Sequence, residues 1–107
     1  KFDGVISTDV AEHIPEDKVQ WFLNDVIGYA NKFVMFCIFT GLAVKNLPDG
    51  RNCHLTVQPA EWWLRQIGIS LGNTDTDLPV VLERLDENIY KLTARMKDVV
   101  VVFRGKE

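Results

Sequence analysis

The sequence lacks several features that would assign it to a class of protein at once. It has two cysteines, Cys37 and Cys53, too few for the disulfide framework of a small secreted domain, so a reducing cytoplasm is the expected compartment. No apolar run approaches the roughly 20 residues needed to cross a bilayer. The longest, Phe33 to Phe39, has the length of a strand. There is no secretory signal, and Lys1 is not an initiator methionine, so we expect the segment to start inside a longer reading frame or after a removed tag.

An excess of positive charge is also missing. The net charge is −3, and lysine and arginine are scattered along the chain, so we expect no nucleic acid partner. A spaced metal chelate is missing too, because Cys53 and His54 are adjacent and cannot both ligate one zinc ion in the usual way. Cys37 lies inside an apolar run and is expected to be a small core residue. We therefore expect no metal site.

What remains is an ordinary globular composition. The 107 residues are 47% hydrophobic and 25% charged, without internal repeats, low-complexity stretches or linkers. This length fits one domain covering residues 1–107.

The first forty residues predict a strand, a helix and a second strand. Phe2–Ser7 reads as a short strand, and Pro15 begins a helix that Asn31-Lys32 ends. Apolar residues recur along that helix at three-and-four spacing, with Trp21 on its flank where it could cover a neighbouring element. Phe33–Phe39 is apolar on both alternating faces, which is typical of a parallel strand covered on both sides. We expect adjacent parallel strands joined by the helix that covers them.

The remaining residues predict a loop, a helix and a three-strand tail. A turn at Pro48-Asp49-Gly50 lies within a long loop from Thr40 to Leu55. A second helix starts near Pro59 and stops at Gly68, with one of Trp62 and Trp63 in the core and the other partly exposed. The expected strands are Pro79–Arg84, Ile89–Arg95 and Val99–Arg104, the last two joined by a tight turn at Lys97-Asp98. The sequence therefore predicts an α/β fold with a mixed sheet and flanking helices.

One phrase suggests a family. The segment from Phe2 to Pro15, with Asp9-Val10-Ala11-Glu12-His13-Ile14-Pro15 as its specific part, resembles the fourth-strand motif of class I S-adenosylmethionine-dependent methyltransferases. It is similar to the version found in ubiquinone-biosynthesis-type and related small-molecule methyltransferases. The stretch from His54-Leu55-Thr56 to Trp62-Trp63 also resembles members in which such a loop leads into the fifth helix. The match covers residues 2–67 and is loose beyond them.

The resemblance implies half of a Rossmann-like fold. The family sheet has seven strands in the order 3-2-1-4-5-7-6, with the seventh antiparallel, and this chain would supply the fourth to the seventh. The Gly-rich loop after the first strand and the acidic residue after the second, which hold the cofactor, have no counterpart here. We expect a C-terminal methyltransferase fragment that is inactive alone and binds no S-adenosylmethionine.

The same resemblance implies roles for six residues. Ser7, Thr8 and Asp9 would lie beside the methionine end of the cofactor, Glu12 and His13 would be catalytic, and His54 would contact the substrate. A nearby His or Glu could remove a proton from a methyl acceptor that needs it. Structural readings stay open: Glu12 could bond backbone amides at the helix entrance, His13 could hold the loop, and His54 could be a loop residue.

A fragment of this kind should leave one strand edge and an apolar surface without cover. We therefore expect a homodimer through the edge strand Phe2–Ser7, and a small-molecule acceptor for the parent enzyme. The alternative is a stand-alone dimeric binding module derived from a methyltransferase. A third reading is an unrelated small α/β domain, favoured if Phe2–Ser7 were not parallel to Phe33–Phe39.

Overall fold

The computed structural model describes residues 2–41, 46–72, 81–94 and 97–104. In these residues the chain forms, in order, β1 (Phe2–Thr8), η1 (Ala11–His13), η2 (Glu16–Lys18), α1 (Val19–Tyr29), β2 (Ala30–Phe39), α2 (Ala60–Gly72), β3 (Val81–Asp86), β4 (Ile89–Ala94) and β5 (Lys97–Arg104). η1 and η2 are single 3₁₀ turns. Neither α-helix is long and apolar enough to cross a membrane.

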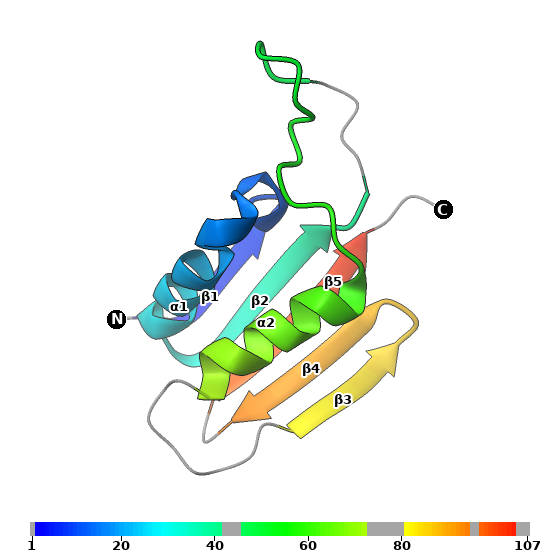
Figure 1. Cartoon of the computed structure of the whole chain (residues 1–107). Coiled ribbons are helices and arrows are strands. Elements are labelled where there is room, and N and C mark those ends of the chain that lie inside the picture. Colours follow the sequence, from blue (N-terminus) through cyan, green and yellow to red (C-terminus); the bar gives the residue numbers. More distant parts are fainter. Residues whose placement is uncertain (1, 42–45, 73–80, 95–96, 105–107) are drawn as a thin grey trace.

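The strands of the described residues form one mixed sheet in the order β1-β2-β5-β4-β3 (Figure 1). β1 pairs with β2 in parallel, and α1 connects them. This confirms the predicted crossover, on which the interpretation of residues 2–39 depends, and it removes the ground for the third reading. The predicted α/β class with a mixed sheet is confirmed as well.

The direction of the last strand was predicted wrongly. β5 runs parallel to β2 and antiparallel to β4, so the strand that opposes the others is β4. β3, β4 and β5 form a meander of three antiparallel neighbours, so β5 runs in the same direction as β3. β5 takes the central position because Val99, Val101 and Phe103 are buried there, whereas every residue of β3 is exposed and that strand lies at the edge.

The expected turn at Lys97-Asp98 is also wrong. Pairing between β4 and β5 begins at Ala94 with Lys97 and continues at Thr93 with Asp98, so Lys97 and Asp98 belong to the strand. Thr93 Oγ1 donates a hydrogen bond of 2.9 Å to Asp98 Oδ1 across this pair. Pro79 and Arg95, at the expected strand ends, lie outside the described residues.

Both predicted helices exist with shifted ends. α1 proper begins at Val19 after the η2 turn and stops at Tyr29, so Asn31-Lys32 lies in β2 instead of ending the helix. α2 continues through Gly68 to Gly72. A glycine inside a helix costs about 1 kcal/mol, but beyond it Leu71 is buried and Ser70 Oγ donates 2.8 Å to Gln20 Oε1 of α1. Tertiary contacts therefore outweigh the local stop signal.

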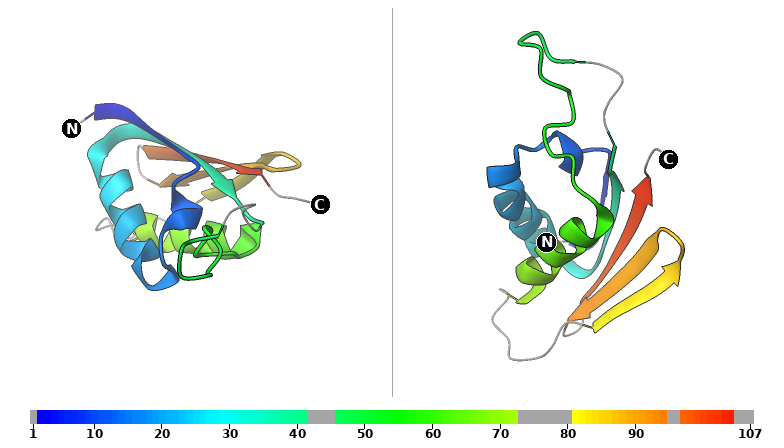
Figure 2. Two further views of the ribbon diagram at one scale, coloured as in Figure 1. Left: turned by 90° about the horizontal axis from the view of Figure 1, so that it is seen from above. Right: turned by 45° about the vertical axis from the view of Figure 1, so that its right-hand side comes forward.

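Both helices cover the same face of the sheet (Figures 1 and 2). On that face Val34, Phe36 and Ile38 of β2 are buried together with residues of the two helices and of β5. β2 was expected to be covered on both sides, and this is wrong for the described residues, in which no helix lies over the opposite face. Apolar side chains on that open face include Ile6 of β1, 64% exposed, and Phe33 of β2, 44% exposed.

The predictions for the three tryptophans are confirmed in part. Trp63 is buried and Trp62 is partly buried, with their rings 5.0 Å apart in a T-shaped contact, so the predicted division into one core and one partly exposed ring is confirmed. Trp21 is 67% exposed, so the suggestion that it covers a neighbour is wrong.

Cys37 was expected in the core and is only half-buried, because it points to the uncovered face.

Two substitutions in β2 should report which face is covered. Phe36 is fully buried beneath the helices and Phe33 lies on the open face, so Phe36→Ala should lower the free energy of unfolding by about 3–5 kcal/mol. Phe33→Ala should lower it by less than about 1.5 kcal/mol. Urea denaturation at low protein concentration measures both. Equal losses would contradict the one-sided core.

Candidate functional site

The candidate site lies where β1 and β2 end. Parallel strands place their carboxyl ends at one edge of the sheet, and ligands of open α/β folds bind at such edges. Here the chain turns sharply at Asp9, which has a left-handed φ of 59°. Aspartate tolerates this conformation better than most residues. The Asp9 N–H donates to the carbonyl of Cys37 at 3.0 Å, which fixes the turn against β2 and brings the next residues beneath the strand ends.

Glu12 is the most deeply placed charged residue of the site, at 1% exposure. Within the described part of the chain its carboxylate accepts one hydrogen bond, from the Phe39 N–H to Oε1 at 3.2 Å. Its own carbonyl accepts from the Thr56 N–H at 3.1 Å, and Thr56 Oγ1 donates 2.6 Å to the carbonyl of Ile14. Glu12 and Thr56 therefore connect the loop after β1, the end of β2 and the approach to α2.

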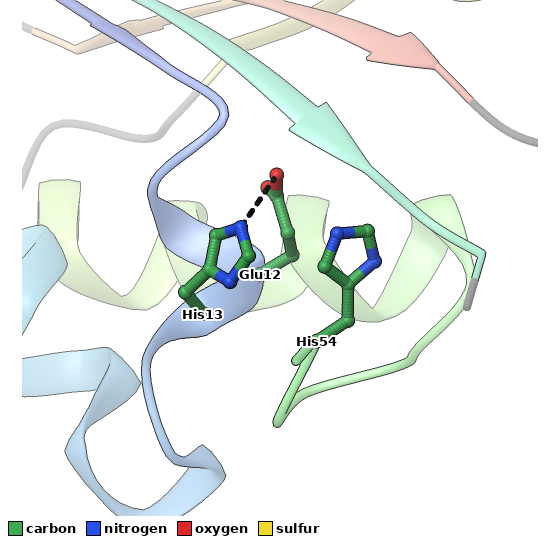
Figure 3. A group of neighbouring side chains, drawn as sticks. All are labelled: Glu12, His13 and His54. Atoms are coloured by element: carbon green, nitrogen blue, oxygen red, sulfur yellow. Dashed lines mark ion pairs between the residues drawn. The ribbon is translucent and has the colours of Figure 1, made fainter. Parts of the chain in front are cut away.

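His13 stands beside Glu12 with its side chain 45% exposed (Figure 3). Its Nδ1 lies 2.8 Å from the carbonyl oxygen of Cys53. A carbonyl can only accept, so Nδ1 carries the proton and donates it, and in the neutral ring Nε2 holds the lone pair. That Nε2 lies 4.0 Å from Glu12 Oε2. A basic ring nitrogen next to a carboxylate can accept a proton from a bound molecule.

His54 approaches from the other side, on the loop that leads into α2 (Figure 3). Its Nδ1 donates to the carbonyl of Gly41 at 2.7 Å, so by the same reasoning its Nε2 is also unprotonated in the neutral ring. The ring lies against His13, with centroids 4.8 Å apart, and against Phe39 at 5.1 Å. It borders a pocket of about 320 Å³, which is lined by Pro15, Glu16, Arg51, Asn52, His54 and Leu55.

The three residues predicted to contact a cofactor do not join this cluster. Ser7 and Thr8 are the last residues of β1 and point to opposite faces, since Ser7 pairs with the buried Phe36 and Thr8 with Cys37. The carboxylate of Asp9 forms an ion pair of 2.9 Å with Arg104. The structure thus brings Glu12, His13 and His54 together, while Asp9 lies against the end of β5.

Sequence reasoning missed the role of Arg104. Hydrogen bonding to the Cys37 sulfur, and then attraction by the Asp9 carboxylate, raise the pKa of the Arg104 guanidinium. Its position at the end of β5, beside the ends of β1 and β2, follows from the parallel pairing of β2 with β5. An antiparallel last strand, as the family resemblance implied, would have placed Arg104 at the opposite edge.

A scan against protein-family models finds no match for this chain, and searches of curated proteins and of solved structures find none either.

The hydrogen bond from Thr56 to Ile14 should contribute measurably to stability. Thr56→Val keeps the shape of the side chain but leaves the Ile14 carbonyl without its hydroxyl donor, so the free energy of unfolding should fall by about 1–2 kcal/mol. The matched control is Thr8→Val on the exposed end of β1, with an expected change within about 0.5 kcal/mol. Urea denaturation compares the two. A Thr56→Val chain as stable as the control would contradict this account of the loop.

Proposed function

We propose that this chain is the C-terminal half of a class I S-adenosylmethionine-dependent methyltransferase whose parent enzyme acts on a small molecule. The observation that supports it most is the position of the segment from Asp9 to Pro15. This segment resembles the family motif and follows a parallel strand that a helix connects to the next strand. β5 runs parallel to β2, whereas the last strand of the family sheet is antiparallel. The support therefore comes from residues 2–67.

In the proposed enzyme S-adenosylmethionine would supply the methyl group, and S-adenosylhomocysteine would be the leaving group. The protein mainly has to align the three reacting centres. Ser7, Thr8 and Asp9 would lie along the methionine part of the cofactor. His13 Nε2 would take the acceptor proton, with the negative charge of Glu12 stabilising the resulting imidazolium. His54 would contact the acceptor in the adjoining pocket.

The compartment we propose is the cytoplasm. Cys37 and Cys53 are both free thiols, which fits a reducing environment.

The nucleotide sequence upstream of the Lys1 codon tests the proposal. A cut methyltransferase requires a strand, a Gly-rich loop and a helix there, followed by a strand that ends in an acidic residue. A start codon close to Lys1, without these elements, would contradict the proposal and favour the binding module.

Without a Gly-rich loop and a ribose-binding acid, the chain should not retain the cofactor. Isothermal titration of S-adenosylmethionine into the chain should give no saturable heat, because the missing groups are the Gly-rich turn that lets the backbone approach the cofactor and the acid that binds its ribose hydroxyls. S-adenosylhomocysteine, which has no sulfonium charge, is the matched control ligand and should also give no saturable heat. A micromolar dissociation constant for either would overturn the expectation.

The second candidate is a dimeric binding module. β1 lies at a sheet edge, and its exposed apolar side chains are Phe2 and Ile6, each 64% exposed. An unpaired edge beside an uncovered apolar face favours association. A two-fold axis at β1 would pair this strand with its copy and continue one sheet through both chains.

Light scattering coupled to size exclusion tests this association. The unmodified chain should elute as a dimer at high concentration, and Ile6→Lys should shift it to a monomer because a charge would face the apolar patch. Leu85→Lys, at the opposite edge strand β3, is the matched control and should leave the dimer intact. A monomer at every concentration would exclude the dimer, and loss of the dimer only with Leu85→Lys would move the interface to β3.

A further inference from the structure

We propose that Glu12, His13 and His54 form a binding site for a divalent transition-metal ion. One ligand atom from each residue lies within 4.8 Å of the other two (Figure 3). These are the only two histidines of the chain, and they come from loops 41 positions apart in sequence to lie on either side of one buried carboxylate. This differs from the expectation of no metal site, which considered Cys37, Cys53 and His54 but neither Glu12 nor His13.

The hydrogen bonds of the two rings are those of metal ligands. Both Nδ1 atoms are engaged by backbone carbonyls, of Cys53 and of Gly41, at 2.8 and 2.7 Å. A ligating histidine typically donates its second ring N–H to such an acceptor, which fixes the tautomer and the ring orientation. Both Nε2 lone pairs are therefore available for a cation, and the rings are held by backbone atoms that do not depend on side-chain rotamers.

Glu12 supplies the negative charge. Its carboxylate is 1% exposed, and one backbone N–H at 3.2 Å is a small compensation for removing a charge from water. The neighbouring His13 Nε2, at 4.0 Å, lies beyond hydrogen-bond distance. A cation between these atoms would compensate the buried charge, which gives the carboxylate a physical reason to be here.

The donor set indicates which ions fit. Two imidazole nitrogens and one carboxylate oxygen suit Zn²⁺, Co²⁺ or Fe²⁺, whereas Mg²⁺ and Ca²⁺ prefer oxygen ligands alone. Ligand atoms about 2.0–2.1 Å from a tetrahedral zinc lie about 3.3 Å apart. The 4.0 Å between His13 Nε2 and Glu12 Oε2, and the separations of up to 4.8 Å within the cluster, must therefore shorten by small side-chain rotations, which the partly exposed His13 allows. Three protein ligands leave a position open to water or to a bound molecule.

Metal binding by the chain itself tests the site without any assay of methyl transfer. With an ion bound, His13 Nε2 would be a ligand and could not also take the proton of an acceptor. After treatment with a chelator and buffer exchange, Zn²⁺ and Co²⁺ should each bind with one-to-one stoichiometry in isothermal titration, and bound Co²⁺ should show visible absorption of a low-coordinate site. His54→Ala and Glu12→Gln should each weaken binding by about 100-fold. Mg²⁺ should produce no saturable heat. Equal affinity of the unmodified chain and these variants, or no binding at all, would overturn the proposal.

Two controls make the result specific. Cys53→Ser removes the thiol next to His54 and should keep full affinity, whereas loss of binding in Cys53→Ser alone would assign the ion to the cysteine and overturn the site. Imidazole ¹⁵N spectra of the unmodified chain avoid variants that fail to fold: Zn²⁺ should shift Nε2 of both rings and leave both Nδ1 atoms protonated. A shift in one ring or none would contradict the proposed ligand set.

Discussion

The buried end of the loop after β1 is held by two hydrogen bonds that Glu12 accepts from backbone N–H groups. The carboxylate of Glu12 accepts from the N–H of Phe39, and its carbonyl accepts from the N–H of Thr56. Three segments that are distant in sequence therefore meet at the carboxyl ends of β1 and β2. A buried carboxylate with one donor is costly unless further groups compensate it. The positions of His13 and His54, each anchored to a backbone carbonyl, depend on the same junction.

The one-sided sheet imposes a second constraint. β2 is apolar on both faces, but α1 and α2 both pack on the face that carries Val34, Phe36 and Ile38. The opposite face carries Phe33, whose ring lies so close over Gly4 that a Cβ added to this glycine would collide with the ring. A ring that covers a glycine on an edge strand buries part of an otherwise open surface. Ile6 of β1 remains 64% exposed on the same face.

Much of the architecture could be predicted because it is encoded in local patterns. Alternating apolar runs and a helical repeat identified β1, α1 and β2, and the loop phrase before α1 directed attention to Glu12 and His13. The path of the tail could not be predicted in this way. Which of the three strands takes the central position depends on how well each is buried. β5, with Val99 to Phe103, takes it instead of β3 because it pairs with β2 on one side and β4 on the other. Likewise α2 continues beyond Gly68, where Ser70 donates a hydrogen bond to Gln20 of α1, which is distant in sequence.

The meeting of His54 with Glu12 illustrates the same limit for the site. Nothing in the local sequence of His54 points to Glu12, since the adjacent residues suggested a loop and the family resemblance suggested a substrate contact. The contact arises from the chain folding back after β2, with Thr56 fixed to Ile14 and Glu12. The cluster is therefore complete within this chain, whereas a nucleotide site at the same strand ends would need a Gly-rich loop from elsewhere. Metal affinity and cofactor affinity should thus be separable properties, because the groups that would provide the first already lie within 4.8 Å of one another, whereas those that would provide the second are not in this sequence.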